Sequence, residues 1–424
     1  MMNTRYEASL EYARDCDSSD TLFAFRDRFH IPQHLDTDSK YFCGNSLGLQ
    51  PKSVAYLMEQ ELADWAKYGV EGHFMARNPW FSYHHLFSER LGKIVGALKD
   101  EVVAMNTLTV NLHLLMLSFY RPTKTRYKII MEAGAFPSDQ YAIATQAAMH
   151  GFNPDEAIIE VAPRQGKHLI AHEDILEAIN AAGESLALVI LGGVNYYTGQ
   201  LFNMEGITAA AHAVGAYAGF DLAHAVGNVP LHLHDWQVDF ACWCSYKYLN
   251  SGPGAVGGVF VHEVHSYDPT VFRAAGWWGN DEKTRFKMEK HFVPQAGAGG
   301  WQMSNAPVFN MVALNASLDV FDKAGMAALR EKSLNLTGYM EFLLQQLEGL
   351  PFEIITPADP AQRGCQLSLL FFKDGKKYFD ALTEAGVIAD WREPNVIRIA
   401  PVPLYNSYED CYRFYAAMLK LSQQ

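Results

Sequence analysis

The chain has 424 residues, 49% of them hydrophobic and 19% charged, which is the composition of an ordinary folded protein of two or three domains. Its 34 lysines and arginines against 47 aspartates and glutamates give a formal charge of −13, without the basic field that nucleic acids and anionic membranes require. Six cysteines are too few for a disulfide scaffold, and the acidic N-terminus contains no secretory signal. We therefore expect a cytoplasmic protein with neither a nucleic-acid nor a membrane partner.

The first 120 residues predict helices around one irregular loop. Residues 1–50 have the pattern of a polar helix followed by the loop Gly44-Asn45-Ser46-Leu47-Gly48-Leu49. Apolar residues then recur at three- and four-residue intervals over residues 54–65, which is typical of an amphipathic helix. The most apolar window, residues 102–120, carries several Asn and Thr side chains and a His. It therefore predicts a buried helix rather than a membrane span.

The middle of the chain alternates short apolar runs with helical stretches. We predict strands at 127–131, 157–161, 186–191, 216–222 and 254–262, and helices at 137–150, 172–182 and 206–214. The run 186–191 is apolar at every position, as strands buried on both faces of a parallel sheet are. This βαβ alternation predicts a mainly parallel sheet covered by helices, in which the last strand could run antiparallel.

After residue 305 the pattern becomes a mixture of helices and short strands. Helices are predicted at 308–321, 329–347 and 376–385 and at the C-terminus, with strands at 352–355, 366–372, near 387 and at 396–399. We therefore predict an α/β protein in three parts. Residues 1–50 form a segment that packs with the small domain, residues 51–305 a large domain, and residues 306–424 a small α+β domain.

The most informative pair of residues is Asp221 and Lys247. Asp221 ends an apolar strand, and Lys247 follows in an apolar and aromatic run before the glycine-rich Ser251-Gly252-Pro253-Gly254. Open α/β sheets bind ligands at the carboxyl ends of their strands. A desolvated lysine there can form a Schiff base, and a carboxylate at Asp221 could hold the pyridinium nitrogen of pyridoxal phosphate protonated. The alternative is a surface lysine and a strand-end aspartate with no joint role.

A phosphate group would need a cradle of backbone N–H groups at a helix start. The run Asn106-Thr107-Leu108-Thr109 opens an apolar helix and supplies free amides together with two hydroxyl groups. Plain N-capping by the threonine or the asparagine explains the same residues, so this run alone does not decide for a phosphate site.

Six motifs in one order along the chain resemble the kynureninase family. They are Gly44-Asn45-Ser46-Leu47-Gly48, Phe136-Pro137-Ser138-Asp139, Tyr196-Tyr197-Thr198-Gly199, Phe220-Asp221-Leu222-Ala223-His224, Trp243-Cys244-Ser245-Tyr246-Lys247 and Ala400-Pro401-Val402-Pro403-Leu404-Tyr405. The resemblance spans roughly residues 20 to 420. It implies the fold-type-I fold of pyridoxal-phosphate enzymes in the aspartate aminotransferase superfamily, with a large, mainly parallel, seven-stranded sheet domain and a smaller C-terminal one.

The resemblance also implies an activity. It implies hydrolytic cleavage of the β–γ carbon bond of L-kynurenine or 3-hydroxy-L-kynurenine, which yields anthranilate or 3-hydroxyanthranilate together with L-alanine. Such an enzyme would act in tryptophan breakdown or in NAD biosynthesis. The sequence does not choose between the two substrates or the two routes.

Residue roles follow from the same resemblance. It implies that Lys247 is the Schiff-base lysine, Asp221 the partner of the pyridinium nitrogen, and Tyr246 a group that assists the addition of water. It implies a Phe136 ring stacked on the cofactor, and a glycine, Gly192, where some relatives have a serine. The implied cofactor-binding residues are Leu108, Thr109, Phe136, Ser138, Asp139, Gly192, Asp221, His224, Tyr246, Lys247, Trp277 and Asn305.

The implied substrate-binding residues are Ser46, His73, Asn305 and Arg398. Arg398 suits the substrate's carboxylate because a guanidinium can bind it in bidentate fashion. Trp277 and Asn305 match residues that reach the site from a partner subunit. The resemblance therefore implies a homodimer with shared active sites.

Alternative functions stay open at this point. An aminotransferase or a cysteine-desulfurase-like enzyme would share the lysine and the aspartate, and a non-catalytic relative would keep the fold as a binding protein. Histidines and cysteines also cluster in the sequence, but their spacing matches no familiar zinc module, so no metal site is predicted. These residues are His224, His232, His234, Cys242 and Cys244.

Overall fold

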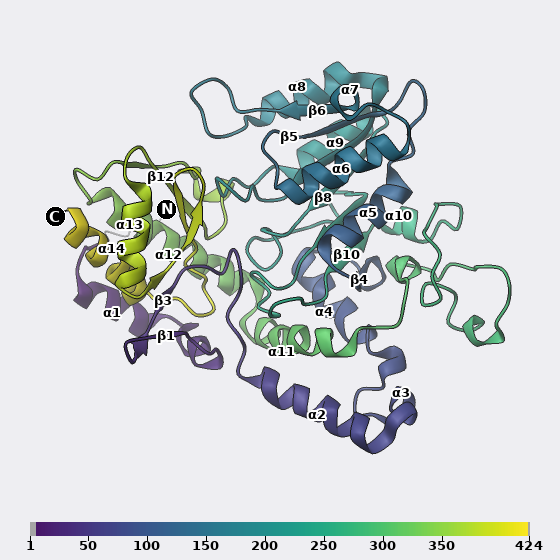
Figure 1. Ribbon diagram of the computed structural model, residues 1–424, viewed down its shortest axis with the longest axis horizontal. Coiled ribbons are helices and arrows are strands. Elements are labelled where there is room, and N and C mark those ends of the chain that lie inside the picture. The colour runs from purple at the N-terminus through teal and green to yellow at the C-terminus, as the bar shows by residue number, and fades with distance from the viewer. Residues whose placement is uncertain (1–5, 423–424) are drawn as a thin grey trace.

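The computed structural model describes residues 6–422, in which a large α/β domain adjoins a smaller one (Figure 1). The centre of the large domain is a seven-stranded sheet, and the predicted, mainly parallel arrangement is confirmed, with β10 antiparallel to both of its neighbours. In spatial order the strands are β4 (Val102–Ala104), β10 (Gly258–Val261), β9 (Phe240–Trp243), β8 (Tyr217–Asp221), β7 (Leu186–Gly192), β5 (Lys128–Glu132) and β6 (Ile158–Val161).

Alternate side chains of the central strands supply two separate cores. Along β7, Leu188 and Ile190 pack with α5 (Leu108–Phe119) and α6 (Pro137–Met149) on one face. Val189 and Leu191 point the other way. The helices on that second face are α4 (His85–Val95), α8 (His172–Ala182), α9 (Met204–Ala213) and α11 (Val308–Ala324). Because both faces are covered, the strand is apolar at every position, as its sequence predicted.

Two strands of the large sheet depart from the sequence prediction. The helix predicted over residues 102–120 is wrong for its first residues, because β4 pairs there with β10 and α5 begins only at Leu108. Asn106, with a φ of 47°, turns the chain between the two elements. The strand β9 was not predicted at all. Both errors have one cause, since a short apolar run does not distinguish a buried strand from a buried helix until its pairing partner is known.

The small domain is built on an antiparallel sheet. Its spatial order is β11 (Phe352–Ile354), β12 (Leu367–Phe371), β15 (Val396–Ile399) and β14 (Asp390–Arg392). The helices α12 (Met326–Gln345), α13 (Gly375–Glu384) and α14 (Tyr408–Ser422) pack on it in one hydrophobic core. In this domain β14 is the strand that the sequence did not predict. It carries Asp390, which binds Arg398, and Arg392, which lines the cavity described below.

The N-terminal segment lies against the small domain. Its helix α1 (Leu10–Ser19) packs on α14, and β3 (Lys40–Tyr41) pairs in parallel with β13 (Val387–Ile388), next to the short hairpin of β1 (Gln33–His34) and β2 (Thr37–Asp38). A buried ion pair joins the Lys332 Nζ to an Asp20 oxygen at 2.6 Å. The chain then crosses to the large domain through the loop that contains Ser46.

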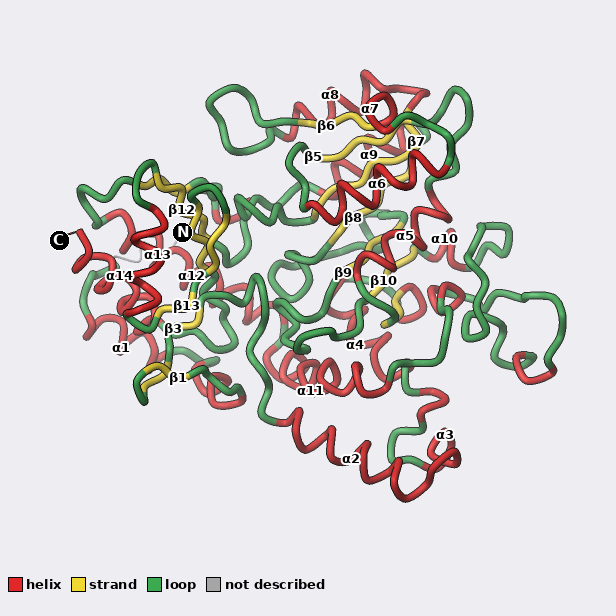
Figure 2. Tube along the Cα trace, in the orientation of Figure 1, coloured by secondary structure: helices red, strands yellow, loops and turns green. Residues whose placement is uncertain are grey.

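Two parts of the large domain extend from its core. The helix α2 (Ser53–Tyr68) packs along α11, and α3 (Gly72–Met75) follows it at the lower edge of Figure 1. After the short helix α10 (Glu263–Ser266) the chain up to residue 297 is mostly loop (Figure 2). A further short helix, α7 (Pro154–Ala157), precedes β6. Within residues 6–422, no helix is long and apolar enough to cross a membrane.

Candidate active site

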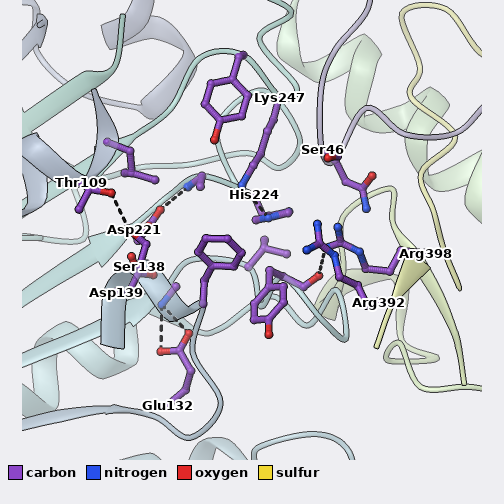
Figure 3. Close-up of a pocket in the computed structure, with 18 of the residues that line it drawn as sticks. Ser46, Thr109, Glu132, Ser138, Asp139, Asp221, His224, Lys247, Arg392 and Arg398 are labelled. Atoms are coloured by element: carbon purple, nitrogen blue, oxygen red, sulfur yellow. Dashed lines mark hydrogen bonds between the residues drawn. The ribbon is translucent and has the colours of Figure 1, made fainter. Parts of the chain in front are cut away.

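A cavity of about 380 Å³ opens where the central strands end, between the large and the small domain (Figure 3). The strands β5, β7 and β8 end in Glu132, Gly192 and Asp221, which all line it, as ligand sites in open α/β sheets do. Most of the residues predicted from the sequence line this one cavity. They are Ser46, Leu108, Thr109, Phe136, Ser138, Asp139, Gly192, Asp221, His224, Tyr246, Lys247 and Arg398.

The Lys247 amine lies beside a neutral histidine. Its Nζ is 2.9 Å from the His224 Nε2 and 6.0 Å from the centroid of the Phe136 ring. Burial, and then the charge of Lys247, lower the pKa of His224 well below its ordinary value, so the imidazole accepts this hydrogen bond in its neutral form. The amine is therefore oriented without being paired to a carboxylate, which leaves it available as a nucleophile.

Two buried aspartates, Asp221 and Asp139, lie together on the other side of the cavity. Asp221 ends β8, and its Oδ1 accepts a hydrogen bond of 2.7 Å from the backbone N–H of Ala223. Burial raises the pKa of both Asp221 and Asp139, and the carboxyl groups share a hydrogen bond. Lys247 and the Ala223 N–H favour the charge on Asp221, whereas Asp139 faces negative neighbours. The neighbouring groups therefore favour the proton on Asp139 and the negative charge on Asp221.

The start of α5 offers an anion site. Its N-cap residue, Thr107, makes no side-chain capping hydrogen bond, so the alternative of plain capping is wrong and the first N–H groups of the helix are free of side-chain caps. The hydroxyls of Thr109 and Ser138 lie 2.7 Å apart beside it. This end of the cavity therefore has the donors that a phosphate group requires.

The opposite end of the cavity carries a buried arginine (Figure 3). The side chain of Arg398 is 1% exposed, its Nε donates to an Asp390 oxygen at 2.9 Å, and its Nη1 donates to the Tyr196 carbonyl at 2.6 Å. Its Nη2 lies 2.7 Å from the same Asp390 oxygen but makes no well-directed hydrogen bond within residues 6–422. Arg398 lines the cavity, so its guanidinium group supplies positive charge there for a carboxylate.

The glycine-rich loop that contains Ser46 needs its glycines for a close approach. A Cβ at Gly48 would stand 2.3 Å from the Lys247 carbonyl, and the Gly48 N–H donates to the Tyr246 carbonyl at 2.8 Å. Any side chain there would push the loop away from the lysine. The motif therefore holds Ser46 at the cavity and ties the N-terminal segment to the segment that carries Lys247.

Three predicted residues lie outside this cavity. His73 and Asn305 line a second cavity of about 240 Å³ between α2 and the start of α11, together with Glu61. Trp277 is 46% exposed on the long loop that follows α10. Within one copy of the chain, the structure does not bring these three residues to Lys247.

Two charged residues that line the cavity, Glu132 and Arg392, are absent from the site predicted from the sequence. Glu132 ends the apolar strand β5 in the same way that Asp221 ends β8, so the signal that singled out Asp221 would have found it. Arg392 lies one strand from Arg398, and both guanidinium groups bind Asp390. An alternating Asp-x-Arg pattern on a predicted strand is a weak signal, and β14 was not predicted.

The donor set of the cavity fits pyridoxal phosphate. Lys247 supplies the amine, ionised Asp221 an acceptor for a protonated ring nitrogen, and the start of α5 the phosphate donors. The His224 Nδ1 is a buried polar atom that lacks a hydrogen-bond partner in the described part of the chain, so it is free for a bound group.

The histidine and cysteine residues noted in the sequence do not gather in one place. His224 binds Lys247, whereas His234 lies with Glu101 and His262, and a second group joins His84 and His85 to Glu282. In the first of these groups, Glu101 already accepts hydrogen bonds from His234 and from the Glu263 N–H. We assign no metal to either group.

Comparisons with known proteins were made against families, curated sequences and solved structures. A family model described as aminotransferase class-V matches residues 41–373, and one described as the kynureninase C-terminal domain matches residues 329–418. The kynureninase of Koribacter versatilis (strain Ellin345) is 53% identical over 98% of each chain, and that of Myxococcus xanthus (strain DK1622) is 55% identical over 96% of each.

Solved structures share the fold at low sequence identity. The cysteine desulfurase CsdA of Escherichia coli matches with a TM-score of 0.75 at 16% identity, over 95% of this chain and 99% of that one. The apo cysteine desulfurase of Thermococcus onnurineus NA1 matches with a TM-score of 0.73 at 16% identity, over 91% and 95%. The predicted fold-type-I architecture is thus confirmed, and the sequence relatives, matched almost end to end, establish that this chain belongs to the kynureninase family.

Proposed function

We propose that this chain is a hydrolase that converts L-kynurenine, or its 3-hydroxy form, to the corresponding anthranilate and L-alanine, with pyridoxal phosphate bound at Lys247. One observation carries the proposal: a single cavity holds the Lys247 amine between the carboxyl group of Asp221 and the buried Arg398. That set can anchor a cofactor and bind an amino-acid carboxylate. The relatives that carry the name kynureninase over nearly the whole chain support the substrate class.

Each polar residue of the cavity has a separate role in the proposed reaction. Bound pyridoxal phosphate supplies an electron sink for negative charge at the substrate's α-carbon. Asp221 holds a proton at the ring nitrogen because it is ionised, while Asp139 donates its hydrogen bond to Asp221. The Lys247 amine would hold the cofactor and, when free, would be the base whose Nζ takes the substrate's α-proton. Neutral His224 accepts a hydrogen bond from that amine and keeps it oriented.

Water addition and substrate orientation fall to two further side chains. Burial raises the pKa of the Tyr246 phenol, and the neighbouring Cys244 raises it further, so the phenol stays protonated and acts as a donor. A phenol O–H can polarise the γ-carbonyl while water adds to it. Arg398 binds the carboxylate through its guanidinium group, which Asp390 and the Tyr196 carbonyl hold in place, and so orients the bond to be broken.

The first test is the product that the purified chain forms. We expect anthranilate fluorescence to appear in step with alanine when kynurenine is added together with pyridoxal phosphate. Formation of a keto acid as the main product would favour an aminotransferase, and the absence of any turnover with bound cofactor would favour a binding protein. The ratio of kcat/KM for kynurenine and 3-hydroxykynurenine then names the preferred substrate.

We propose further that the enzyme is a homodimer in which each site borrows residues from the other copy. The face around α3 and the loop after α10 exposes large apolar side chains, which in a monomer would stay in water. Phe74 is 65% exposed, Phe286 56% and Met288 77%. His73 and Asn305 lie at this side of the chain, away from Lys247. In a dimer, the second copy would supply its His73 and Asn305 to the cavity that contains Lys247.

Hybrid dimers test the sharing directly. Lys247→Ala and Asn305→Ala chains with different tags are co-expressed, and the mixed dimer is purified through both tags. If the sites are shared, one of the two sites combines an intact Lys247 with an intact Asn305, and we expect activity well above that of either parent. A hybrid no more active than its parents, or a fully active monomer in sedimentation, would contradict the shared site.

We also propose the division into residues 1–50, 51–305 and 306–424, and a cytoplasmic location. The pairing of β3 with β13 supports assigning the N-terminal segment to the small domain. The six cysteines, all free, support a reducing compartment.

A further inference from the structure

Glu132 is a buried carboxyl group in the cavity that the proposed mechanism does not use. It is the last residue of β5, is 5% exposed and lines the cavity. Its two oxygens lie 3.1 and 3.2 Å from the backbone nitrogen of Gly192, which donates to both (Figure 3). Burying a carboxyl group costs free energy, so a buried carboxyl group that lines a ligand cavity is a candidate for a functional role.

Gly192 and Glu132 fit each other. A Cβ at position 192 would stand 3.1 Å from the Glu132 Oε1, close enough that the carboxyl group would have to move. The carboxyl group thus occupies the space that a side chain at residue 192 would take. The donor of this hydrogen bond is the backbone N–H of Gly192, the last residue of β7. The strand therefore fixes the position of the Glu132 oxygen that accepts it.

Two acidic groups of the large domain act on Glu132 or respond to it: Asp221 on β8 raises its pKa, and Asp139 on α6 has its own pKa raised by Glu132. Lys247, after β9, lowers the pKa of Asp139, and the Cys242 thiol on β9 stays neutral because burial raises its pKa well above normal. Negative charge on Glu132 raises the pKa of Asp139, after burial and Asp221. With one lysine among three carboxyl groups, not all three can be ionised.

We propose that Glu132 is a positioning residue of the cofactor cavity, whose carboxylate fills the space that Gly192 leaves and whose charge keeps the proton on Asp139, so that Asp139 donates to Asp221. Glu132 itself does not touch the reacting atoms. It acts through Asp139, and its negative charge favours a protonated ring nitrogen beside Asp221. The part that concerns the ring nitrogen rests on the proposed function, whereas the charge relation among the three carboxyl groups does not.

The pKa of Glu132 sets the pH range in which its charge can act on Asp139. Burial raises its pKa to about 7, against the two hydrogen bonds that favour its charge. Above about pH 7 Glu132 is therefore ionised, and below it the side chain is neutral, as a glutamine would be. In the unfolded chain the carboxyl group ionises at its ordinary pKa of about 4.5. Its ionisation thus costs folding stability increasingly as the pH rises from about 4.5 to 7, and by a constant amount above.

The first measurement is thermal unfolding of the full chain without added cofactor. Glu132→Gln keeps an acceptor for the Gly192 N–H and removes the charge. We expect its melting temperature to exceed that of the wild type by about 2–5 °C at pH 8, with the gap shrinking toward pH 5. The matched control is Glu160→Gln, an exposed glutamate on the neighbouring strand β6, for which we expect no pH-dependent gap.

The second measurement is the dissociation constant of pyridoxal phosphate across the same pH range. At about pH 8.5 we expect Glu132→Gln to bind about fivefold to tenfold more weakly than wild type, since a nearby charge is lost, and at about pH 6 to bind equally. The absorption of the bound cofactor should titrate near pH 7 in wild type and in Glu160→Gln, and lose that step in Glu132→Gln.

The outcomes separate the two proposals. An equal loss of affinity at both pH values would mean a merely structural role, and no loss at either would mean no role; each overturns the inference. A melting gap that does not change with pH also overturns it. If no variant, including wild type, binds pyridoxal phosphate, the proposed function fails, while the unfolding measurement still decides whether Glu132 carries the buried charge.

Discussion

Replacing Lys247 with alanine is expected to lower kcat for kynurenine cleavage by at least ~10²–10⁴-fold, the range lost when a positioned proton-transfer group is removed. The Lys247 amine lies at the centre of the cavity, 2.9 Å from neutral His224, and within residues 6–422 no other lysine lines it. The variant also loses the covalent anchor for the cofactor. Borohydride should then fix no cofactor at residue 247, as peptide mass spectrometry would show, and kcat from initial rates gives the loss.

A matched control and a rescue experiment separate chemistry from folding. Lys167→Ala removes an exposed lysine and should leave both activity and borohydride labelling unchanged. A small primary amine added to Lys247→Ala should restore part of the rate, because the fold around the missing side chain is held by other contacts, such as that of Gly48 with the Tyr246 carbonyl. If Lys247→Ala stays fully active and its cofactor is still fixed by borohydride, Lys247 is not the anchor.

The parallel sheet could be predicted because its strands carry their pattern locally. The run 186–191 is apolar at every position, and helices with their own periodicity separate it from its neighbours. The three-residue β4 and the four-residue β9 are too short to carry such a signal, and their strand state depends on pairing, of β4 with the distant β10 and of β9 with β8 and β10. Local pattern therefore predicts the strands of the βαβ units, including the edge strand β6, but not the short strands β4 and β9.

In the candidate site too, some residues could be predicted from the sequence next to them, whereas others depend on contacts that only the folded chain makes. Asp221 and Lys247 stand out because one ends a strand and the other precedes a glycine-rich loop, and both line the cavity. Arg392 was missed because its role depends on the pairing of β14 with β15, which places Asp390 opposite Arg398. The positions of His73 and Asn305 were named only through a family resemblance, and a contact between two copies leaves no local pattern in one sequence.

The second large effect is expected at Arg398. Arg398→Lys keeps a positive charge but loses the planar fork that serves Asp390, the Tyr196 carbonyl and a ligand at once. We expect KM for kynurenine to rise more than about tenfold, which corresponds to roughly 1.5–3 kcal/mol for a lost charge-assisted hydrogen bond, with a smaller change in kcat. Asp390 keeps Arg392 as a partner, so the variant should still fold, as its melting temperature would show.

The role of Arg398 in carboxylate binding can be isolated through the substrate. Kynurenine amide lacks the negative charge that Arg398 is proposed to bind, so wild type and Arg398→Lys should differ much less in kcat/KM for the amide than for kynurenine. Such a double cycle removes general effects on the cavity, because these would weaken both substrates alike. Equal losses for the two substrates would mean that Arg398 only holds Asp390 and Tyr196 in place. An unchanged KM for kynurenine would remove Arg398 from the site, and the carboxylate would then have to bind Arg392, the other arginine that lines the cavity.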